Sequence, residues 1–243
     1  MGFRVECGNL MLSAHALAAL QEFKDEEQDR IAKFNKMSMI AQESFDLQQR
    51  EANAVPEVTI DDFKEDWQLS QFWYSDETAE ILARELLAGA TEDTTICIVS
   101  APSVYAALKK FPPAEIPTKH IYLLEYDMRF KVLAGSQHFD YYDYNKPLEF
   151  RTDLKGACDR ILVDPPFLEK DCQVKASLTA RALLRPNSPK NSVIVCTGER
   201  MKDVIAKVYP TTKFTTFTPE HKNGLSNEFG CYASFECDSW KFA

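Results

Sequence analysis

The sequence predicts an α/β domain in which a mostly parallel sheet carries helices on both faces. Between residues 95 and 208, short apolar runs typical of buried strands alternate with segments of helical periodicity, which is the pattern of a parallel sheet. Several of these runs end in polar or acidic residues, at the edge where such a sheet binds its ligands. With 243 residues, 45% of them hydrophobic, the chain is long enough for one such domain and an appendage.

The N-terminal part of the chain is predicted to form that appendage. Ser13 is placed to cap a helix whose apolar residues recur at helical spacing as far as Phe23. The segment 24–53 is polar and rich in Glu, Gln, Asp and Lys, which fits a solvated helix or a disordered linker, and we expect partial disorder near residues 42–56. The sequence therefore divides into a helical, partly disordered extension over residues 1–66 and a compact domain over residues 67–243.

The compact domain begins with a cluster of aromatic residues. Trp67 and the run Phe72-Trp73-Tyr74 lie just before Ser75, a favourable N-cap for a helix that ends near Gly89. The aromatic side chains either pack as a plug over the sheet or line a pocket in front of this helix. The sequence leaves both arrangements open.

The alternating elements follow this first helix. Strands are expected at residues 95–99, 120–124, 139–142, 160–163 and 192–196, and helices at residues 104–111, 174–184 and 201–208. A closing pair of strands is expected at residues 213–217 and 231–235, on either side of a polar loop at residues 220–228.

An acidic residue follows three consecutive expected strands. Glu125, Asp143 and Asp164 come after the second, third and fourth strands. Each alone is commonly a loop or capping residue, but three at equivalent positions meet at one edge of a parallel sheet. We expect Glu125 to accept both hydroxyls of a ribose, Asp143 to accept from an adenine amino group, and Asp164 to lie at the reactive end of a nucleoside cofactor.

The run Asp164-Pro165-Pro166-Phe167 suits the transfer of a methyl group to an amine. The carboxylate and the Pro165 carbonyl both accept hydrogen bonds, and two prolines stiffen the loop while removing N–H donors. An aromatic ring offers a face to a flat base or to an ammonium ion. The other interpretation is a rigid turn after a strand, because proline is common there.

The loop after the first expected strand contains no glycine. Ser100-Ala101-Pro102-Ser103 stands where a pyrophosphate-binding loop needs glycine for close backbone approach. This disfavours a dinucleotide and is compatible with S-adenosylmethionine, which has no phosphate.

Charge and cysteine content limit the function classes. A formal net charge of −9 disfavours binding to duplex nucleic acid and fits a basic protein partner better. The seven cysteines form no CxxC pair, so we expect reduced thiols in a cytoplasmic protein with no zinc site. No apolar run approaches the length of a membrane span.

Six motifs together resemble the eukaryotic elongation factor 1-alpha lysine methyltransferases, once labelled N6-adenine-specific DNA methyltransferases. They are Gln71-Phe72-Trp73-Tyr74-Ser75, Val99-Ser100-Ala101-Pro102-Ser103-Val104-Tyr105, Leu124-Glu125-Tyr126-Asp127, Asp143-Tyr144-Asn145, Asp164-Pro165-Pro166-Phe167 and Asn227-Glu228-Phe229. The resemblance covers about residues 10–237. It implies a Rossmann-like, seven-stranded class I methyltransferase fold with an antiparallel C-terminal strand. It also implies S-adenosylmethionine as cofactor and a lysine of elongation factor 1-alpha as acceptor, up to trimethyl-lysine.

The resemblance also assigns site residues. It makes Asp164, Pro165, Pro166 and Phe167 the catalytic loop, in which Phe167 replaces a tyrosine found in relatives. It implies substrate contacts from Phe72, Trp73, Asn227 and Phe229, and no metal. Cofactor contacts are expected from Tyr74, Ser75, Ser100, Ala101, Pro102, Ser103, Glu125, Tyr126, Asp127, Asp143 and Tyr144.

Two other functions remain as alternatives. A nucleic-acid amino-methyltransferase would use the same Asp-Pro-Pro-Phe loop, although the acidic composition argues against it. A non-catalytic α/β binding module would have lost one of the three acids, and the sequence keeps all three.

Overall fold

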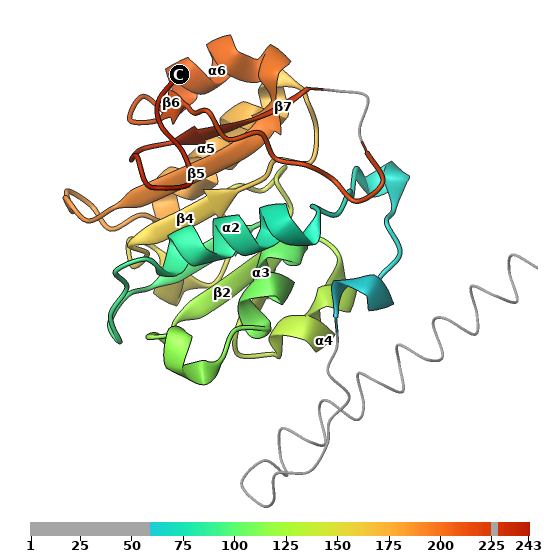
Figure 1. The fold of residues 1–243 in the computed structure, drawn as a ribbon, viewed down its shortest axis with the longest axis vertical. Helices are drawn as coiled ribbons and strands as arrows, with labels where there is room; N and C mark the ends of the chain where they lie inside the picture. The colour runs from blue at the N-terminus through green and yellow to red at the C-terminus, as the bar shows by residue number, and fades with distance from the viewer. Residues whose placement is uncertain (1–58, 225–227) are drawn as a thin grey trace, which may run out of the picture. The chain divides into compact units, whose positions relative to one another are not determined.

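A computed structural model describes residues 59–224 and 228–243. Seven strands form one sheet in the order β3-β2-β1-β4-β5-β7-β6 (Figure 1). Their bounds are β1 Ile96–Val99, β2 Ile121–Glu125, β3 Phe139–Tyr141, β4 Arg160–Val163, β5 Ser192–Gly198, β6 Lys213–Phe214 and β7 Phe229–Ala233. The predicted helix after Ser13 lies outside the described residues.

The sheet is parallel except for β7, which confirms the predicted fold class. β7 pairs antiparallel with β5 and with β6, while the other pairings are parallel. In register, Val99 of β1 stands opposite Leu124 of β2 and Val163 of β4. The residues that follow these three strands therefore emerge at one edge of the sheet.

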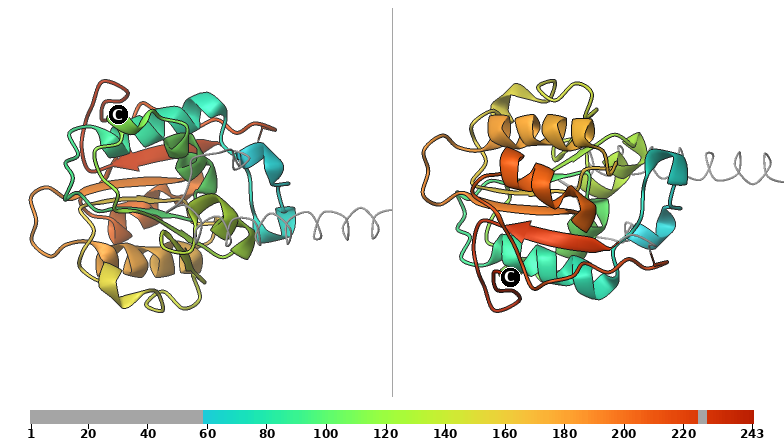
Figure 2. Two further views of the ribbon diagram at one scale, coloured as in Figure 1. Left: turned by 90° about the horizontal axis from the view of Figure 1, so that it is seen from below. Right: turned by 90° about the horizontal axis from the view of Figure 1, so that it is seen from above.

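Helices cover both faces of this sheet. α2 (Asp76–Leu87) and α3 (Pro102–Lys109) lie on one face, and α5 (Lys170–Leu183) and α6 (Lys202–Val208) lie on the other (Figure 2). A short α4 (Lys131–Ala134) follows β2. The 3₁₀ turns are η1 Ile60–Asp62, η2 Trp67–Leu69, η3 Pro113–Glu115, η4 Met128–Phe130, η5 Thr152–Leu154 and η6 Glu199–Met201.

The observed ends differ from the predicted ones for local reasons. α3 begins two residues early, at Pro102, because a proline at the first helical position needs no hydrogen-bonded N–H. β5 extends to Gly198 because its last residues pair with β7. β2 extends to Glu125, which is therefore the last residue of the strand.

Residues 59–66 pack against η4 of the compact domain, whereas the sequence analysis placed them in the extension. They belong to one compact unit over Pro56–Ala243. Ile60 and Phe63 are buried, and the Phe63 ring stacks on Phe130 with centroids 4.5 Å apart.

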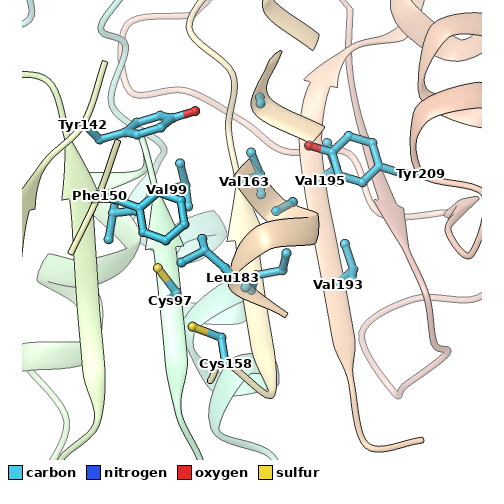
Figure 3. Close-up of a cluster of buried hydrophobic side chains, with 14 of the residues drawn as sticks. Cys97, Val99, Tyr142, Phe150, Cys158, Val163, Leu183, Val193, Val195 and Tyr209 are labelled. Carbon is cyan, nitrogen blue, oxygen red and sulfur yellow. The ribbon is translucent and has the colours of Figure 1, made fainter. Parts of the chain in front are cut away.

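A buried cluster joins β1, β4 and β5 to α5. Val99, Val163 and Val195 pack near Leu183, and the Tyr142 ring lies at one end of the cluster (Figure 3). The cysteines between residues 97 and 237 are free thiols, as predicted. Within residues 59–224 and 228–243, no helix is long and apolar enough to cross a membrane.

Candidate active site

A cavity of about 800 Å³ opens at the carboxyl ends of the parallel strands. The three acids expected to converge, Glu125, Asp143 and Asp164, all line it. The other predicted site residues that line it are Phe72, Trp73, Ser100, Ala101, Pro102, Ser103, Tyr126, Tyr144, Pro165, Pro166, Phe167 and Phe229. Its volume is in the range of small-molecule and cofactor sites.

Asp164 is held in a defined position directly after β4. Its backbone N–H donates to the Val99 carbonyl over 3.0 Å, and its Oδ2 accepts a 2.7 Å hydrogen bond from the Tyr74 hydroxyl. Burial raises the pKa of this carboxyl to about 8; the Tyr74 hydrogen bond opposes the shift and the charge of Glu125 adds to it. The carboxyl is therefore a far stronger base than an ordinary aspartate.

Tyr74 contacts Asp164 and does not line the cavity, and its contact with the cofactor stays a prediction. It is 1% exposed, and burial raises its pKa well above the usual value. The hydroxyl therefore stays protonated and acts as a permanent donor to Asp164. Ser75 does not line the cavity either, because its Oγ caps α2 by accepting from the Thr78 N–H at 3.2 Å.

A buried glutamine of α5, Gln173, holds the far end of the Asp-Pro-Pro-Phe loop. Gln173 Nε2 donates to the Phe167 carbonyl and to Thr197 Oγ1, each over 3.1 Å. Leu168 fits against Gly198, where an added Cβ would lie 2.9 Å from the leucine side chain. The loop is thus tied to α5 and to the end of β5.

Glu125 presents one carboxylate oxygen to the cavity. Its Oε1 accepts from the backbone N–H groups of Tyr126 (2.9 Å) and Asp127 (3.2 Å). Its Oε2 has no hydrogen bond to any residue of the described ranges, 59–224 and 228–243. Burial raises the pKa of this carboxyl to about 7, more than the two backbone N–H groups lower it.

Asp127 does not line the cavity, and its contact with the cofactor stays a prediction. It forms an ion pair with Arg129 over 2.5 Å and accepts a 3.1 Å hydrogen bond from Gln71 Nε2. These contacts tie the segment before α2 to the turn after β2. Asp127 therefore supports the cavity wall rather than the ligand.

Asp143 lies two residues past the end of β3. Its Oδ1 accepts from the Asn145 N–H at 2.8 Å, and the following Tyr144 ring contacts Phe167 with centroids 5.7 Å apart. The segment that carries Asp143 and the Asp-Pro-Pro-Phe loop are therefore linked through one aromatic contact.

The glycine-free loop makes its tight turn with a serine. Ser100 has φ 58°, in the left-handed region that usually needs glycine, and its N–H donates to the Leu124 carbonyl over 2.9 Å. The loop therefore turns sharply without offering the bare backbone that a pyrophosphate requires. In the described part of the chain no cluster of His, Cys, Asp and Glu is arranged to hold a metal ion.

Comparison with known proteins identifies the family. Residues 65–237 match the family described as "Probable N6-adenine methyltransferase". "Protein-lysine N-methyltransferase EFM5" of Saccharomyces cerevisiae is 58% identical over 240 residues, which is 96% of this chain and 94% of the yeast protein. The chain belongs to this family of protein-lysine N-methyltransferases.

Animal relatives agree with this assignment, and one solved structure shares the fold. "EEF1A lysine methyltransferase 1" of Homo sapiens is 38% identical, covering 93% of this chain and 92% of its own length. A branched-chain polyamine synthase from Thermus thermophilus shares the fold, with a TM-score of 0.51, 12% identity, and coverage of 82% of this chain and 65% of its own. Family membership confirms the predicted enzyme class, methyl donor and protein substrate.

The polar groups that line the cavity suit S-adenosylmethionine. Glu125 and Asp143 offer acceptors, as a nucleoside with ribose hydroxyls and an adenine amino group requires. The cavity contains several carboxylates and no phosphate cradle, so its electrostatics favour a cationic sulfonium over a phosphorylated cofactor.

The structure adds lining residues to which the sequence analysis assigned no site role. His221 is the most informative: its ring lies 4.7 Å from both the Tyr74 and Phe229 rings, and burial lowers its pKa to about 4. It therefore forms a neutral wall of the cavity. The full set is Leu69, Ser70, Gln71, Tyr142, Asn145, Leu168, Glu169, Arg200, His221 and Gly224. The predicted substrate residue Asn227 lies outside the described residues.

Proposed function

We propose that this methyltransferase transfers methyl groups from S-adenosylmethionine to a lysine of translation elongation factor 1-alpha in the cytoplasm, up to trimethyl-lysine. The observation that carries the proposal is the hydrogen bond from Tyr74 to Asp164, which lines the cavity, in a chain whose relatives are named EEF1A lysine methyltransferase 1. The assigned roles of individual residues follow from their positions around this pair.

Glu125, Asp143 and the 100–103 loop would hold the cofactor. The open Oε2 of Glu125 would accept from the ribose hydroxyls, and Asp143 would accept from the adenine amino group. When bound, S-adenosylmethionine supplies an electrophilic methyl group on a sulfonium centre. The stiff turn at Ser100 limits how deeply the nucleoside can sit.

Asp164 and the Pro165 carbonyl would orient the acceptor amine. Both accept N–H bonds, so they aim the nitrogen lone pair at the methyl position, and positioning of this kind lowers a barrier by several kcal/mol. The Tyr74 hydroxyl prevents rotation of the carboxylate. Phe167, His221 and Phe229 supply neutral aromatic walls that hold methylated ammonium as well, which permits repeated transfer.

The same carboxylate would accept the proton that the lysine must lose. A lysine ammonium has an ordinary pKa near 10.4 and must lose a proton before it attacks. A partly buried pocket disfavours the charged amine. Because burial raises the pKa of Asp164 to about 8, the proton moves to a much better matched base than an exposed aspartate.

The test compares two acceptor classes with one labelled donor. Purified protein is incubated with radiolabelled S-adenosylmethionine and either elongation factor 1-alpha or adenine-containing oligonucleotides. We expect label in a lysine of the elongation factor, located by mass spectrometry. Label in adenine alone would replace the proposal with the nucleic-acid alternative that the matched family's description suggests.

The same assay tests how the substrate is recognised. The net charge of −9 favours electrostatic docking of a large basic surface, so kcat/KM should fall as salt is raised. A short peptide with the same lysine should react poorly, because it must be ordered on binding. Equal, salt-insensitive values for the protein and the peptide would contradict docking.

A further inference from the structure

Arg200 is the one arginine or lysine among the described residues that line the cavity. Four carboxylates share that lining, on Glu125, Asp143, Asp164 and Glu169. A lysine ammonium is cationic, whereas S-adenosylmethionine carries one carboxylate beside its sulfonium and its ammonium. Arg200 is therefore suited either to the carboxylate of the cofactor or to an anion of the substrate, and the sheet order bears on this choice.

The sheet order places Arg200 on the acceptor side. The proposed cofactor residues lie at or just past the ends of β1, β2 and β3, and Asp164 follows β4. Arg200 belongs to η6, directly after β5, which lies next to β4 in the sheet (Figure 1). The order β3-β2-β1-β4-β5 puts the Asp164 loop between the cofactor residues and Arg200. The guanidinium thus borders the path of the substrate rather than the nucleoside.

The guanidinium is anchored but keeps donors available. Its Nη2 donates to the Leu168 carbonyl over 2.9 Å, which holds the side chain beside the acceptor loop. Within residues 59–224 and 228–243 it forms no ion pair, whereas Arg84, Arg129 and Arg185 each pair with a carboxylate. Arg200 is exposed, and a guanidinium has five N–H donors suited to a carboxylate.

An unpaired cation beside the path of a lysine repels that lysine unless an anion arrives with it. No carboxylate of the described residues pairs with Arg200, and its place past β5, on the far side of the Asp164 loop, favours the substrate over the cofactor as the source of that anion. We propose that Arg200 binds an aspartate or glutamate carboxylate that the protein substrate carries beside its target lysine, and so selects lysines with an acidic neighbour. This proposal rests on the proposed function.

The first test separates substrate binding from cofactor binding and catalysis. Arg200→Ala should raise KM for folded elongation factor 1-alpha about tenfold, and Arg200→Glu should raise it further. We expect kcat at saturating substrate to change by less than about threefold and S-adenosylmethionine affinity, measured by calorimetry, to stay unchanged. Lys207→Ala, which removes an exposed cation on α6 outside the cavity lining, is the matched control.

Two results of this test would overturn the proposal. A loss of S-adenosylmethionine affinity would assign Arg200 to the cofactor, and an unchanged KM would leave it with no role in recognition. If the wild-type enzyme does not methylate the elongation factor at all, the proposed function fails and this inference fails with it.

A charge-swap experiment distinguishes recognition from support of the loop. Each acidic residue of the elongation factor near the methylated lysine is changed to lysine in turn. One such substrate should restore KM for Arg200→Glu while becoming poor for the wild-type enzyme. If Arg200 acted only through the Leu168 carbonyl, no substrate change would rescue the variant, and kcat would fall for every substrate.

Discussion

The Tyr74 hydroxyl donates a 2.7 Å hydrogen bond to Oδ2 of Asp164, so a residue before the first core helix fixes the carboxylate after the fourth strand. The phenol reaches the carboxylate from outside the cavity lining. One oxygen of Asp164 is thereby committed to the protein, and the proposed function assigns the other to the acceptor amine.

Removing the hydroxyl should therefore weaken catalysis without affecting the cofactor. We expect Tyr74→Phe to lower kcat about tenfold, because the carboxylate loses its orienting donor. S-adenosylmethionine affinity, measured by calorimetry, should remain unchanged. The matched control is Tyr209→Phe, since the buried Tyr209 hydroxyl has no partner among the described residues, and it should leave kcat unaltered. Equal kcat values for Tyr74→Phe and wild type would show that the Tyr74 hydroxyl does not orient Asp164 for catalysis.

The open oxygen of Glu125 leads to a prediction about cofactor affinity. Glu125→Gln should weaken S-adenosylmethionine binding by roughly 1–3 kcal/mol, the scale of hydrogen bonds to a charged acceptor. Isothermal titration would measure it, with Glu92→Gln at an exposed position as control. Unaltered affinity in a folded Glu125→Gln protein would exclude the carboxylate from the ribose site.

The two raised pKa values predict how stability depends on pH. Burial raises the pKa of Asp164 to about 8 and that of Glu125 to about 7. Both lie above the values expected in the unfolded chain, so the folded state binds these protons more tightly. Stability should then fall as pH rises from about 4 toward 8, because ionising the buried carboxyls favours unfolding.

Thermal unfolding of the ligand-free protein at pH 5 and pH 8.5 measures this effect. The double variant Asp164→Asn with Glu125→Gln cannot ionise at these positions, so its Tm should fall less between the two pH values than that of the wild type. An equal fall in both proteins would show that other groups control the pH dependence.

Gln173 should matter for catalysis although it does not line the cavity. Gln173→Leu leaves the Phe167 carbonyl and Thr197 hydroxyl without their shared donor, and we expect kcat to fall about tenfold as the loop loosens. Gln137→Leu, at an exposed glutamine outside the cavity lining, is the comparison. A drop in Tm with normal kcat would mean that Gln173 supports the fold alone.

The convergence of Glu125, Asp143 and Asp164 could be predicted because residues that follow parallel strands emerge at one edge of the sheet. The direction of a side chain could not be predicted in this way. Tyr74 and Asp127 are adjacent in sequence to lining residues, yet they contact Asp164 and Arg129 instead. The sequence identified these positions as important but assigned them to the cofactor.

Loop residues without a pattern were missed for a different reason. His221 meets Tyr74 only because the chain returns across the sheet edge, where Ser75 N–H donates to the Glu220 carbonyl over 2.8 Å. Arg200 lies in a 3₁₀ turn that follows an extended β5. No spacing in the sequence marks either residue, because their roles depend on contacts between distant segments.

Asp164→Asn is the most direct test of the account. The amide keeps the shape of the side chain but cannot accept a proton or attract an ammonium. We expect turnover on elongation factor 1-alpha to fall about 10²-fold or more, while S-adenosylmethionine affinity by calorimetry stays near the wild-type value. Turnover within a few fold of wild type in the folded variant would contradict the account and leave the Asp-Pro-Pro-Phe loop a structural turn.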